Sequence, residues 1–350
     1  MALSIFVHVA VALTTPDIPS TMPHLARLVA AAATEPHLVA KEMQEFSHAT
    51  IMPDLGEWRV EDGFQARNAS LPVVLGHGMG DSCFNSGFKG VVASVSAKLG
   101  VYATCIPTGD NVIMDTINGF LLNMDASVDE FAKRVRADPK LAGGFNALGL
   151  SQGNNLIRGY IQKYNDPPVH GFLSICGIHA GVAAFPQCSP SMPGLGKLCL
   201  ALNEVLGDLA YNSLVQSILF QANYFRDPEK LNDTGYKQNS QLAQWNGEGI
   251  NASLPVAKAN WAKTSKYIWV RGTLDTVVWP NIGEQWGALT AGYPTNLTSV
   301  PMRQTKWYLD DSFGLKTADV AGKHHFEEFA GEHIRFTMKE LDAWLDKYFV

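Results

Sequence analysis

Short apolar runs alternate with stretches of helical periodicity along most of the chain. The runs have strand length and predict strands at residues 71–75, 101–106, 145–150, 171–175, 266–271 and 306–309. Helical spacing predicts helices at 88–99, 127–138, 155–164 and 336–348, the second opened by a capping box at Ser127-Val-Asp-Glu130. Because strands that alternate with helices form parallel sheets, we expect an α/β fold, a mostly parallel sheet with helices on both faces.

The regular alternation is interrupted in two places. Residues 21–46 are rich in alanine with charged residues between, which predicts one or two helices outside the main fold. Residues 180–262 contain proline clusters, polar loops and one strong helical segment at 209–225, and we interpret them as a lid-like subdomain inserted over the sheet. The expected layout is a candidate signal peptide at 1–20, an N-terminal extension at 21–70, and an α/β domain at 71–350 with its insertion at about 180–262.

The N-terminus and four glycosylation sequons favour the secretory pathway. Residues 4–13 have the length of the apolar core of a signal peptide, with small residues where a peptidase could cut. No positive charge precedes this run and it contains His8, so an ordinary apolar N-terminus is the alternative. The candidate glycosylation sites of the form N-x-[ST] are Asn68, Asn232, Asn251 and Asn296.

Composition narrows the class of protein further. The chain has 350 residues, 46% of them hydrophobic and 17% charged, which is typical of a globular protein with a large core. A net charge of -6 argues against a nucleic-acid partner. No apolar run approaches the roughly 18 residues that a membrane span requires, so we expect no integral membrane segment.

Gly149-Leu-Ser-Gln-Gly153 fits the nucleophile elbow G-x-S-x-G. In this motif a serine occupies a tight turn between a strand and a helix, and its hydroxyl projects above the sheet. The predicted strand 145–150 and the predicted helix 155–164 flank Ser151 in the required order. The pattern therefore indicates that Ser151 is a catalytic nucleophile.

A serine nucleophile needs a carboxylate that orients its base, placed after a later strand. Asp275 follows the predicted strand 266–271 and is the candidate, with a turn-forming aspartate as the alternative. Asp310 and Asp311 follow the predicted strand 306–309, but we expect them to come too late for another strand to precede the histidine.

The base should follow the acid in the chain. His333 lies immediately before the predicted last helix and is the candidate. His324 and His325 are the alternatives, and their polar surroundings predict that both are exposed. His77 and His179 precede Asp275 and so have the wrong order.

An oxyanion hole takes one N–H group from the residue after the nucleophile and one from the turn after an early strand. Gln152 supplies the first, and Met79 in the glycine-rich turn 76–80 is the candidate for the second. A phosphate-binding loop is the alternative interpretation of this turn, but the G-K-[ST] ending is missing.

The cysteines indicate one disulfide and one buried thiol. Cys188 and Cys199 bracket a loop rich in proline and serine, and we expect a disulfide between them. Cys176 ends an apolar run and is expected to be buried. Because five cysteines cannot all pair within the chain, at least one is left over.

Longer motifs surround the candidate residues. They include Gly76-His-Gly-Met-Gly-Asp-Ser-Cys83, Phe145-Asn-Ala-Leu-Gly-Leu-Ser-Gln-Gly153, Gly177-Ile-His-Ala-Gly-Val182, Gln221-Ala-Asn-Tyr-Phe-Arg-Asp-Pro228 and Gly331-Glu-His333. In these segments the chain resembles the palmitoyl-protein thioesterases, lysosomal α/β-hydrolases that remove fatty acyl groups from cysteine. The resemblance covers most of residues 71–334, whereas the first 70 residues have no clear counterpart.

This resemblance implies roles for the residues already singled out. The family's nucleophile, acid and base fall on Ser151, Asp275 and His333, and its oxyanion donors on Met79 and Gln152. It also supports the Cys188–Cys199 disulfide and implies that residues 180–262 form the groove for the acyl chain. Phe84 stands where a second adjacent cysteine is common in the family, which leaves the partner of Cys83 open.

The function expected from the resemblance is hydrolysis of long-chain acyl thioesters, S-palmitoyl groups on protein cysteines above all. S-acylated proteins or peptides would be the partners, the compartment lysosomal or extracellular, and no metal or organic cofactor is implied. Alternatives with the same triad are an esterase or lipase and an acyl-CoA thioesterase. A non-catalytic lipid-binding protein is the third.

Overall fold

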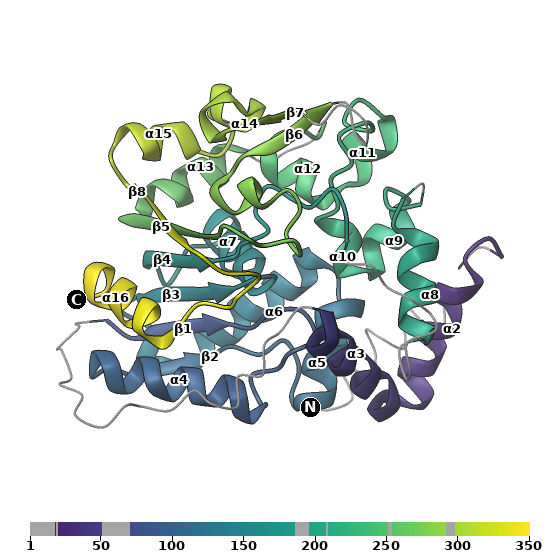
Figure 1. Cartoon of the computed structure of the whole chain (residues 1–350), viewed down its shortest axis with the longest axis horizontal. Helices are drawn as coiled ribbons and strands as arrows, with labels where there is room; N and C mark the ends of the chain where they lie inside the picture. The colour runs from purple at the N-terminus through teal and green to yellow at the C-terminus, as the bar shows by residue number, and fades with distance from the viewer. Residues whose placement is uncertain are drawn as a thin grey trace.

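The structure is a computed structural model, and it describes residues 18, 20–50, 71–185, 196–207, 209–250, 254–291 and 298–350. Its centre is a parallel sheet of six strands in the order β2-β1-β3-β4-β5-β8 (Figure 1). All five strand pairings are parallel, as the alternation of strands and helices predicts. The strands are β1 (Val73–Gly76), β2 (Ala103–Cys105), β3 (Phe145–Leu150), β4 (Val169–Ile175), β5 (Lys266–Gly272) and β8 (His324–Phe329).

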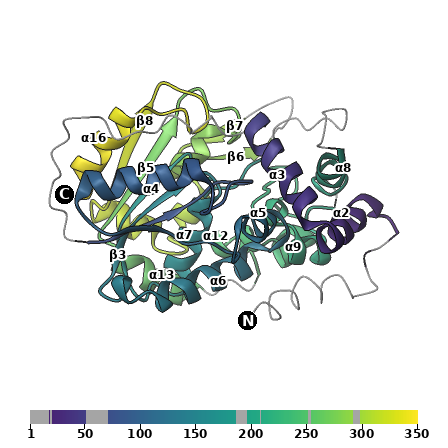
Figure 2. The same ribbon diagram turned by 90° about the horizontal axis from the view of Figure 1, so that it is seen from below.

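Helices cover both faces of this sheet, which confirms the predicted fold class. Alternate strand residues enter two separate cores, since successive side chains in a strand point to opposite faces. One core joins Leu75 and Leu148 to α4 (Ser86–Leu99) and α16 (Met338–Tyr348). The other joins Ala147 and Phe172 to α6 (Met124–Ala137), α7 (Gly153–Lys163) and α13 (Leu254–Lys263), and Figure 2 shows the two groups of helices apart.

The region of the predicted insertion is helical but irregular. The single helix predicted at 209–225 is wrong: two short helices, α9 (Ser213–Ile218) and α10 (Phe220–Asn223), stand in its place. Leu219 has extended backbone and separates them, while the Asn212 side chain caps the first by accepting the N–H of Leu214. The other helices in the described part of this region are α8 (Gly196–Val205), α11 (Thr234–Asn239), α12 (Gln241–Asn246) and α13, which ends it.

Two further predictions from periodicity are wrong. Residues 306–309 form the helix α14 (Lys306–Leu309) instead of a strand, and α15 (Leu315–Val320) follows it. The last strand of the large sheet is β8, which lies at the sheet edge. Its sequence consists mostly of histidine and glutamate, so it lacks the apolar run by which the other strands were predicted. A small antiparallel pair, β6 (Ala288–Ala291) and β7 (Thr298–Val300), was not predicted.

The predicted capping box at Ser127 is also wrong. Helix α6 begins three residues earlier, where the Asn123 side chain accepts the N–H of Ala126 at 3.0 Å. The Ser127 hydroxyl instead donates to the Leu122 carbonyl at 3.0 Å. Helix α6 is therefore about one turn longer than predicted. Its end at Ala137 agrees with the prediction.

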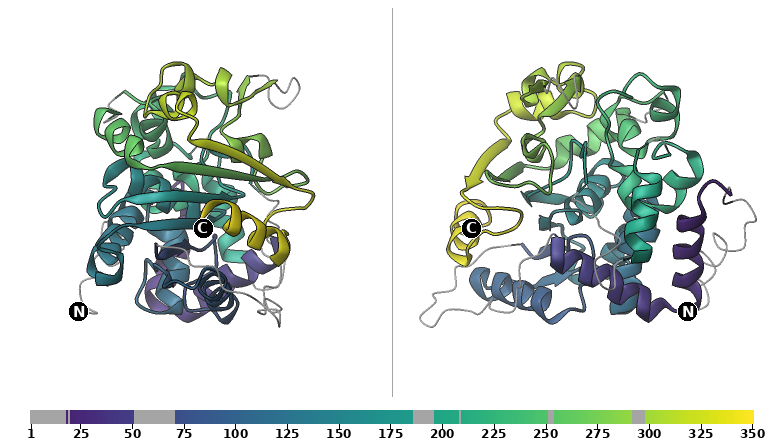
Figure 3. Two further views of the ribbon diagram at one scale, coloured as in Figure 1. Left: turned by 90° about the vertical axis from the view of Figure 1, so that its left-hand side faces the viewer. Right: turned by 45° about the vertical axis from the view of Figure 1, so that its right-hand side comes forward.

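The N-terminal helices α2 (Pro23–Thr34) and α3 (Pro36–Thr50) belong to the main fold rather than lying outside it. Met43 and Phe46 enter the same core as Leu75. Helix α2 packs along α8, as the right-hand view of Figure 3 shows. Glu204 of α8 fixes the start of α2 by accepting the backbone N–H groups of His24 and Leu25. The described part of the extension, up to Thr50, is thus part of the folded unit.

The remaining elements are α5 (Val112–Leu121) and three short 3₁₀ helices at 139–141, 281–285 and 302–304. Within the described residues, no helix combines the length and the apolar character needed to cross a bilayer.

The sheet core predicts a large cost for truncating Phe172, which is completely buried in β4. Changing Phe172→Ala should lower the free energy of unfolding by about 3–5 kcal/mol, because it removes buried apolar surface and leaves a cavity. Phe326 in β8 is 42% exposed and offers the matched control, for which we expect less than about 1 kcal/mol. Urea denaturation measures both. Equal losses at the two sites would contradict the assigned core.

Candidate active site

Ser151 lies on a strained turn between β3 and α7. Its φ is +50°, in the left-handed region that residues with a side chain seldom adopt. The turn is packed so closely that a Cβ on Gly153 would lie 2.4 Å from the carbonyl carbon and oxygen of Gly76. The Asn154 amide steadies the turn by donating to the carbonyls of Ser151 and Ile175, both at 3.0 Å. The sequence therefore requires glycine at 153 to place the serine next to β1.

His333 connects Ser151 to Asp275. Its Nε2 lies 2.9 Å from the Ser151 Oγ, and its Nδ1 lies 2.5 Å from the Asp275 Oδ2. All three side chains are buried. With the Nδ1 proton donated to the carboxylate, Nε2 is left to accept the serine proton. The structure thus brings together three residues that lie far apart in the sequence.

Asp275 is held as a carboxylate. Its Oδ1 accepts the backbone N–H groups of Val277 and Val278 at 2.8 and 3.0 Å. Burial by itself raises the pKa of the Asp275 carboxyl, but the hydrogen bond and the charge of His333 outweigh it and lower that pKa. A negative charge beside the imidazole stabilises the protonated form that a general base must pass through.

The alternative bases are engaged elsewhere, and the expectation that they are exposed is wrong. His324 is buried at the start of β8, where the Trp269 indole N–H donates to its Nδ1 at 2.7 Å. Burial lowers the pKa of His324 to about 4. His325 is half-buried and its ring lies against Tyr348.

The alternative acids, Asp310 and Asp311, have partners other than His333, but the expectation that no strand lies between them and the histidine is wrong. A strand, β8, does follow them in the chain. Asp310 forms an ion pair with Lys306 one helical turn earlier. Asp311 accepts the backbone N–H of Thr317 at 3.0 Å.

The two candidate oxyanion donors follow the neighbouring parallel strands β1 and β3. Met79 lies in the turn after β1 and Gln152 directly after Ser151. The Gln152 amide donates to the Gly119 carbonyl at 2.8 Å. Its Oε1 accepts from the Gln221 amide at 3.1 Å and from the Tyr224 hydroxyl at 3.2 Å.

Tyr224 is a residue that sequence reasoning missed, although it stands in one of the motifs that carry the resemblance. Its hydroxyl lies 3.7 Å from the Met79 Sδ as well as 3.2 Å from the Gln152 Oε1. Burial raises its pKa far above the usual value for tyrosine, so it stays a neutral donor. It therefore links the side chains of both candidate oxyanion residues.

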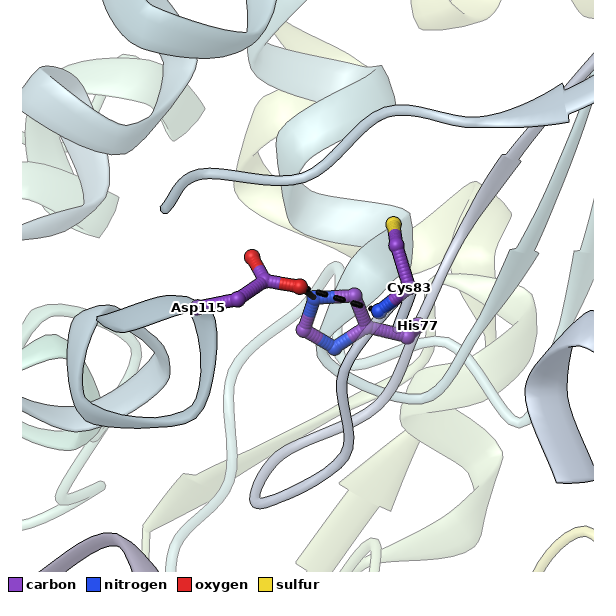
Figure 4. A group of neighbouring side chains, drawn as sticks. All are labelled: His77, Cys83 and Asp115. Carbon is purple, nitrogen blue, oxygen red and sulfur yellow. Dashed lines mark hydrogen bonds and ion pairs between the residues drawn. The ribbon is translucent and has the colours of Figure 1, made fainter. Parts of the chain in front are cut away.

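A buried ion pair supports the turn that carries Met79 (Figure 4). The His77 Nε2 lies 3.3 Å from the Asp115 Oδ2, and its Nδ1 lies 2.9 Å from the Gly78 carbonyl oxygen. Asp115 also accepts the Ser82 hydroxyl at 2.8 Å and the Cys83 N–H at 2.9 Å. Burial lowers the pKa of His77, but Asp115 outweighs it and raises that pKa to about 9.

Cys83, whose partner the sequence left open, forms a disulfide with Cys105 of β2. The bond ties the far end of the Met79 turn to the sheet. Cys176 is a free buried thiol, as predicted. Its Sγ accepts the Ile334 N–H at 3.4 Å, and burial raises its pKa well above the ordinary value. A protonated thiol beside the triad is a packing group and no nucleophile.

Glu284 is a second residue that periodicity and motifs did not reveal. Its carboxyl is completely buried and its Oε2 accepts the Gly272 N–H at 2.9 Å. Burial and the neighbouring charge of Asp275 raise the pKa of Glu284 well above its ordinary value. The pKa values of these two neighbouring carboxyls are thus shifted in opposite directions, that of Asp275 toward ionisation and that of Glu284 toward protonation.

Several predicted residues lie outside the described part of the chain. They are Cys188, Asn68, Asn251 and Asn296. The Cys188–Cys199 disulfide and all four glycosylation sites stay predictions. Asn232 is described, and its exposed side chain accepts from the Lys237 ammonium at 3.2 Å.

Fold and site together define an α/β-hydrolase. A parallel sheet carries a serine on a strand–turn–helix elbow, and an aspartate and a histidine follow it after later strands. A family model described as palmitoyl protein thioesterase matches residues 72–333, and the chain belongs to this family.

Curated relatives agree with that assignment. Palmitoyl-protein thioesterase 1 of Caenorhabditis elegans is 31% identical over 81% of this chain and 94% of the relative. Palmitoyl-protein thioesterase 3 of Dictyostelium discoideum is 30% identical over 74% of this chain and 83% of the relative. Lysosomal thioesterase PPT2 of Homo sapiens is 25% identical over 73% of this chain and 79% of the relative.

Replacing Glu284 by glutamine should change how stability depends on pH. Because the folded pKa of Glu284 is raised above the ordinary value of 4.5, the folded state loses stability as the pH rises above that value. Glu284→Gln removes this penalty. The free energy of unfolding of the variant relative to the wild type should therefore rise with pH, by about 1.4 kcal/mol per unit at most.

Urea denaturation at several pH values between 5 and 8 measures this difference. The exposed Glu332→Gln, whose side chain is 66% accessible, is the matched control and should show no such trend. A pH-independent difference for Glu284→Gln would mean that Glu284 is ionised in the folded protein.

Proposed function

We propose that the protein hydrolyses long-chain acyl thioesters, S-palmitoyl groups on protein cysteines above all, through an acyl-enzyme on Ser151. The observation that carries the proposal is the 2.9 Å contact between the Ser151 Oγ and the Nε2 of His333, itself hydrogen-bonded to Asp275. Membership of the palmitoyl protein thioesterase family supports the thioester as substrate.

The first step is acylation. His333 takes the proton of Ser151 as the hydroxyl attacks the thioester carbonyl carbon. The carbonyl oxygen becomes an oxyanion, for which the backbone N–H groups of Met79 and Gln152 are the proposed donors. The tetrahedral intermediate collapses by breaking the carbon–sulfur bond, and the leaving thiolate takes up the proton from His333, so that the imidazole is neutral again for the second step. A thiol has a pKa near 8.5, so this leaving group requires less protonation than an alkoxide.

The second step is hydrolysis of the acyl-enzyme. His333 takes a proton from water, which attacks the Ser151 ester, and then returns the proton to the serine oxygen as the fatty acid leaves. Asp275 keeps the imidazole in the tautomer with its proton on Nδ1 and stabilises the imidazolium in both steps. Every step uses residues of this chain.

The cellular site of action that we propose is the lysosome or another part of the secretory pathway. The Cys83–Cys105 disulfide supports it, since such bonds persist in oxidising compartments. The relative named lysosomal thioesterase PPT2 supports it as well. The candidate signal peptide and the acyl groove within residues 180–262 stay proposals on the same footing.

A comparison of three substrates with the same acyl chain tests the reaction. They are an S-palmitoyl peptide, the matching O-palmitoyl-serine peptide and palmitoyl-CoA. We expect the S-palmitoyl peptide to have the highest kcat/KM, and Ser151→Ala to lower kcat by about 10⁴-fold or more. A fluorophosphonate should label the wild type once and the variant not at all. Preference for the O-ester would favour an esterase, whereas no turnover and no labelling would favour a lipid-binding protein.

The role of Asp275 has its own test. Asp275→Asn keeps the shape of the side chain but no longer fixes the tautomer of His333, so kcat should fall by about 10⁴-fold. Asp310→Asn is the matched control, since the Asp310 side chain is 48% exposed and forms an ion pair with Lys306. Steady-state kinetics on the S-palmitoyl peptide measure both. If only Asp310→Asn lost activity, Asp310 rather than Asp275 would be the residue that orients His333.

A further inference from the structure

A helix that lies outside the family-matched residues contacts the turn that carries a candidate oxyanion donor. The family model begins at residue 72, whereas α3 ends at Thr50. The side chain of Ser47, which is 1% exposed, donates to the Met79 carbonyl at 2.6 Å.

The approach of α3 to this turn depends on a glycine. Gly80 has a φ of +75°. A Cβ on Gly80 would lie 2.4 Å from the Ser47 Cβ and 2.8 Å from the Met43 carbonyl oxygen. Since real Cβ atoms do not approach so closely, any other residue at 80 would push α3 away from the turn. The sequence of the turn and the position of the helix are therefore matched.

Helix α3 is itself fixed from two sides. Phe46 contacts Phe120 of α5 edge-to-face, and the Gln44 amide donates to the Thr116 hydroxyl of the same helix at 3.1 Å. On the other side, Glu42 accepts the backbone N–H of Leu198 in α8 at 2.7 Å. A helix held by α5 and α8 can act as a rigid support for the turn.

The hydrogen bond from Ser47 acts on the backbone beside the Met79 N–H. The Met79 N–H belongs to the peptide unit that joins residues 78 and 79, and the Met79 carbonyl to the next unit. His77 holds the first unit, because its Nδ1 lies 2.9 Å from the Gly78 oxygen. Ser47 holds the second. Because the atoms of a peptide unit are coplanar, holding the Gly78 oxygen orients the Met79 N–H. Holding the Met79 carbonyl restrains rotation about the Met79 Cα, which would otherwise tilt that N–H.

From these contacts we infer that Ser47, supplied by the N-terminal extension, is a positioning residue for the oxyanion hole. It acts through the Met79 carbonyl and touches no substrate. The inference rests on the proposed function, in which the Met79 N–H binds the oxyanion. The extension thereby becomes part of the catalytic machinery of this chain.

The test compares two serines that make the same hydrogen bond. Ser47 and Ser96 are both helical, and each donates to a backbone carbonyl at 2.6 Å, Ser96 to Val101. Ser47→Ala should lower kcat for the S-palmitoyl peptide about 10–100-fold with little change in KM, because a misdirected donor weakens transition-state binding. Ser96→Ala should leave both constants close to wild type.

Inhibitor binding separates positioning from general loosening. A palmitoyl trifluoromethyl ketone forms an oxyanion on Ser151, so its affinity for Ser47→Ala should fall by the same factor as kcat. The affinity for palmitate, which forms no such adduct, should stay within about twofold of wild type. Should Ser47→Ala fail to fold, Ser47→Cys keeps the side-chain shape with a weak donor, and a fall in kcat with KM unchanged is then expected.

The two levels of the proposal can fail separately. If the wild type does not hydrolyse the thioester, the proposed function fails. If it does and Ser47→Ala behaves as Ser96→Ala does, or loses ketone and palmitate affinity equally, only the positioning role is overturned.

Discussion

The close contact between Gly76 and Gly153 is the constraint on which the site depends. Because β1 and β3 are neighbours in register, the turn after β1 and the elbow after β3 meet at the same edge of the sheet. A side chain on Gly153 would strike the Gly76 carbonyl at 2.4 Å, so only glycine lets the two turns touch. This contact sets the spacing between Ser151, the proposed nucleophile, and Met79, the proposed oxyanion donor. Elements farther away, α3 among them, refine a geometry that this contact establishes.

Charge is distributed unevenly around that contact. On one side, Asp115 pairs with His77. Burial raises the pKa of the Asp115 carboxyl, but His77 outweighs it and lowers that pKa to about 2. On the other, Asp275 pairs with His333, while Glu284 and the thiol of Cys176 have raised pKa values. Burial thus favours the protonated forms of Glu284 and Cys176, and the carboxyl whose pKa is lowered is the one that contacts His333, Asp275.

Much of this could be predicted from the sequence, and the failures have physical reasons. The elbow is local, since glycine spacing around Ser151 follows from the turn itself. Asp275 and His333 are distant in sequence, but strand order fixes which loops they occupy. The strand β8 was missed because only its two end residues, His324 and Phe329, are buried, so that no apolar run marks it. Residues 306–309 were wrongly predicted as a strand because three successive apolar residues have no distinguishable period. Glu284, Tyr224 and Ser47 act through contacts between distant elements, which no local pattern records.

The same logic bears on substrate selection. A triad with an oxyanion hole accepts oxygen esters and thioesters alike, so selectivity must come from the surrounding elements. One of these is α10, whose Gln221 donates to the Gly119 carbonyl at 3.0 Å and to the Gln152 Oε1 at 3.1 Å. Tyr224 at its end bonds to the same Oε1. A displacement of α10 would therefore move the side chain of Gln152, the residue next to Ser151. Helix α10, within the proposed insertion, is in this way connected by hydrogen bonds to Gln152, a candidate oxyanion donor, so that the positions of the two depend on the same contacts.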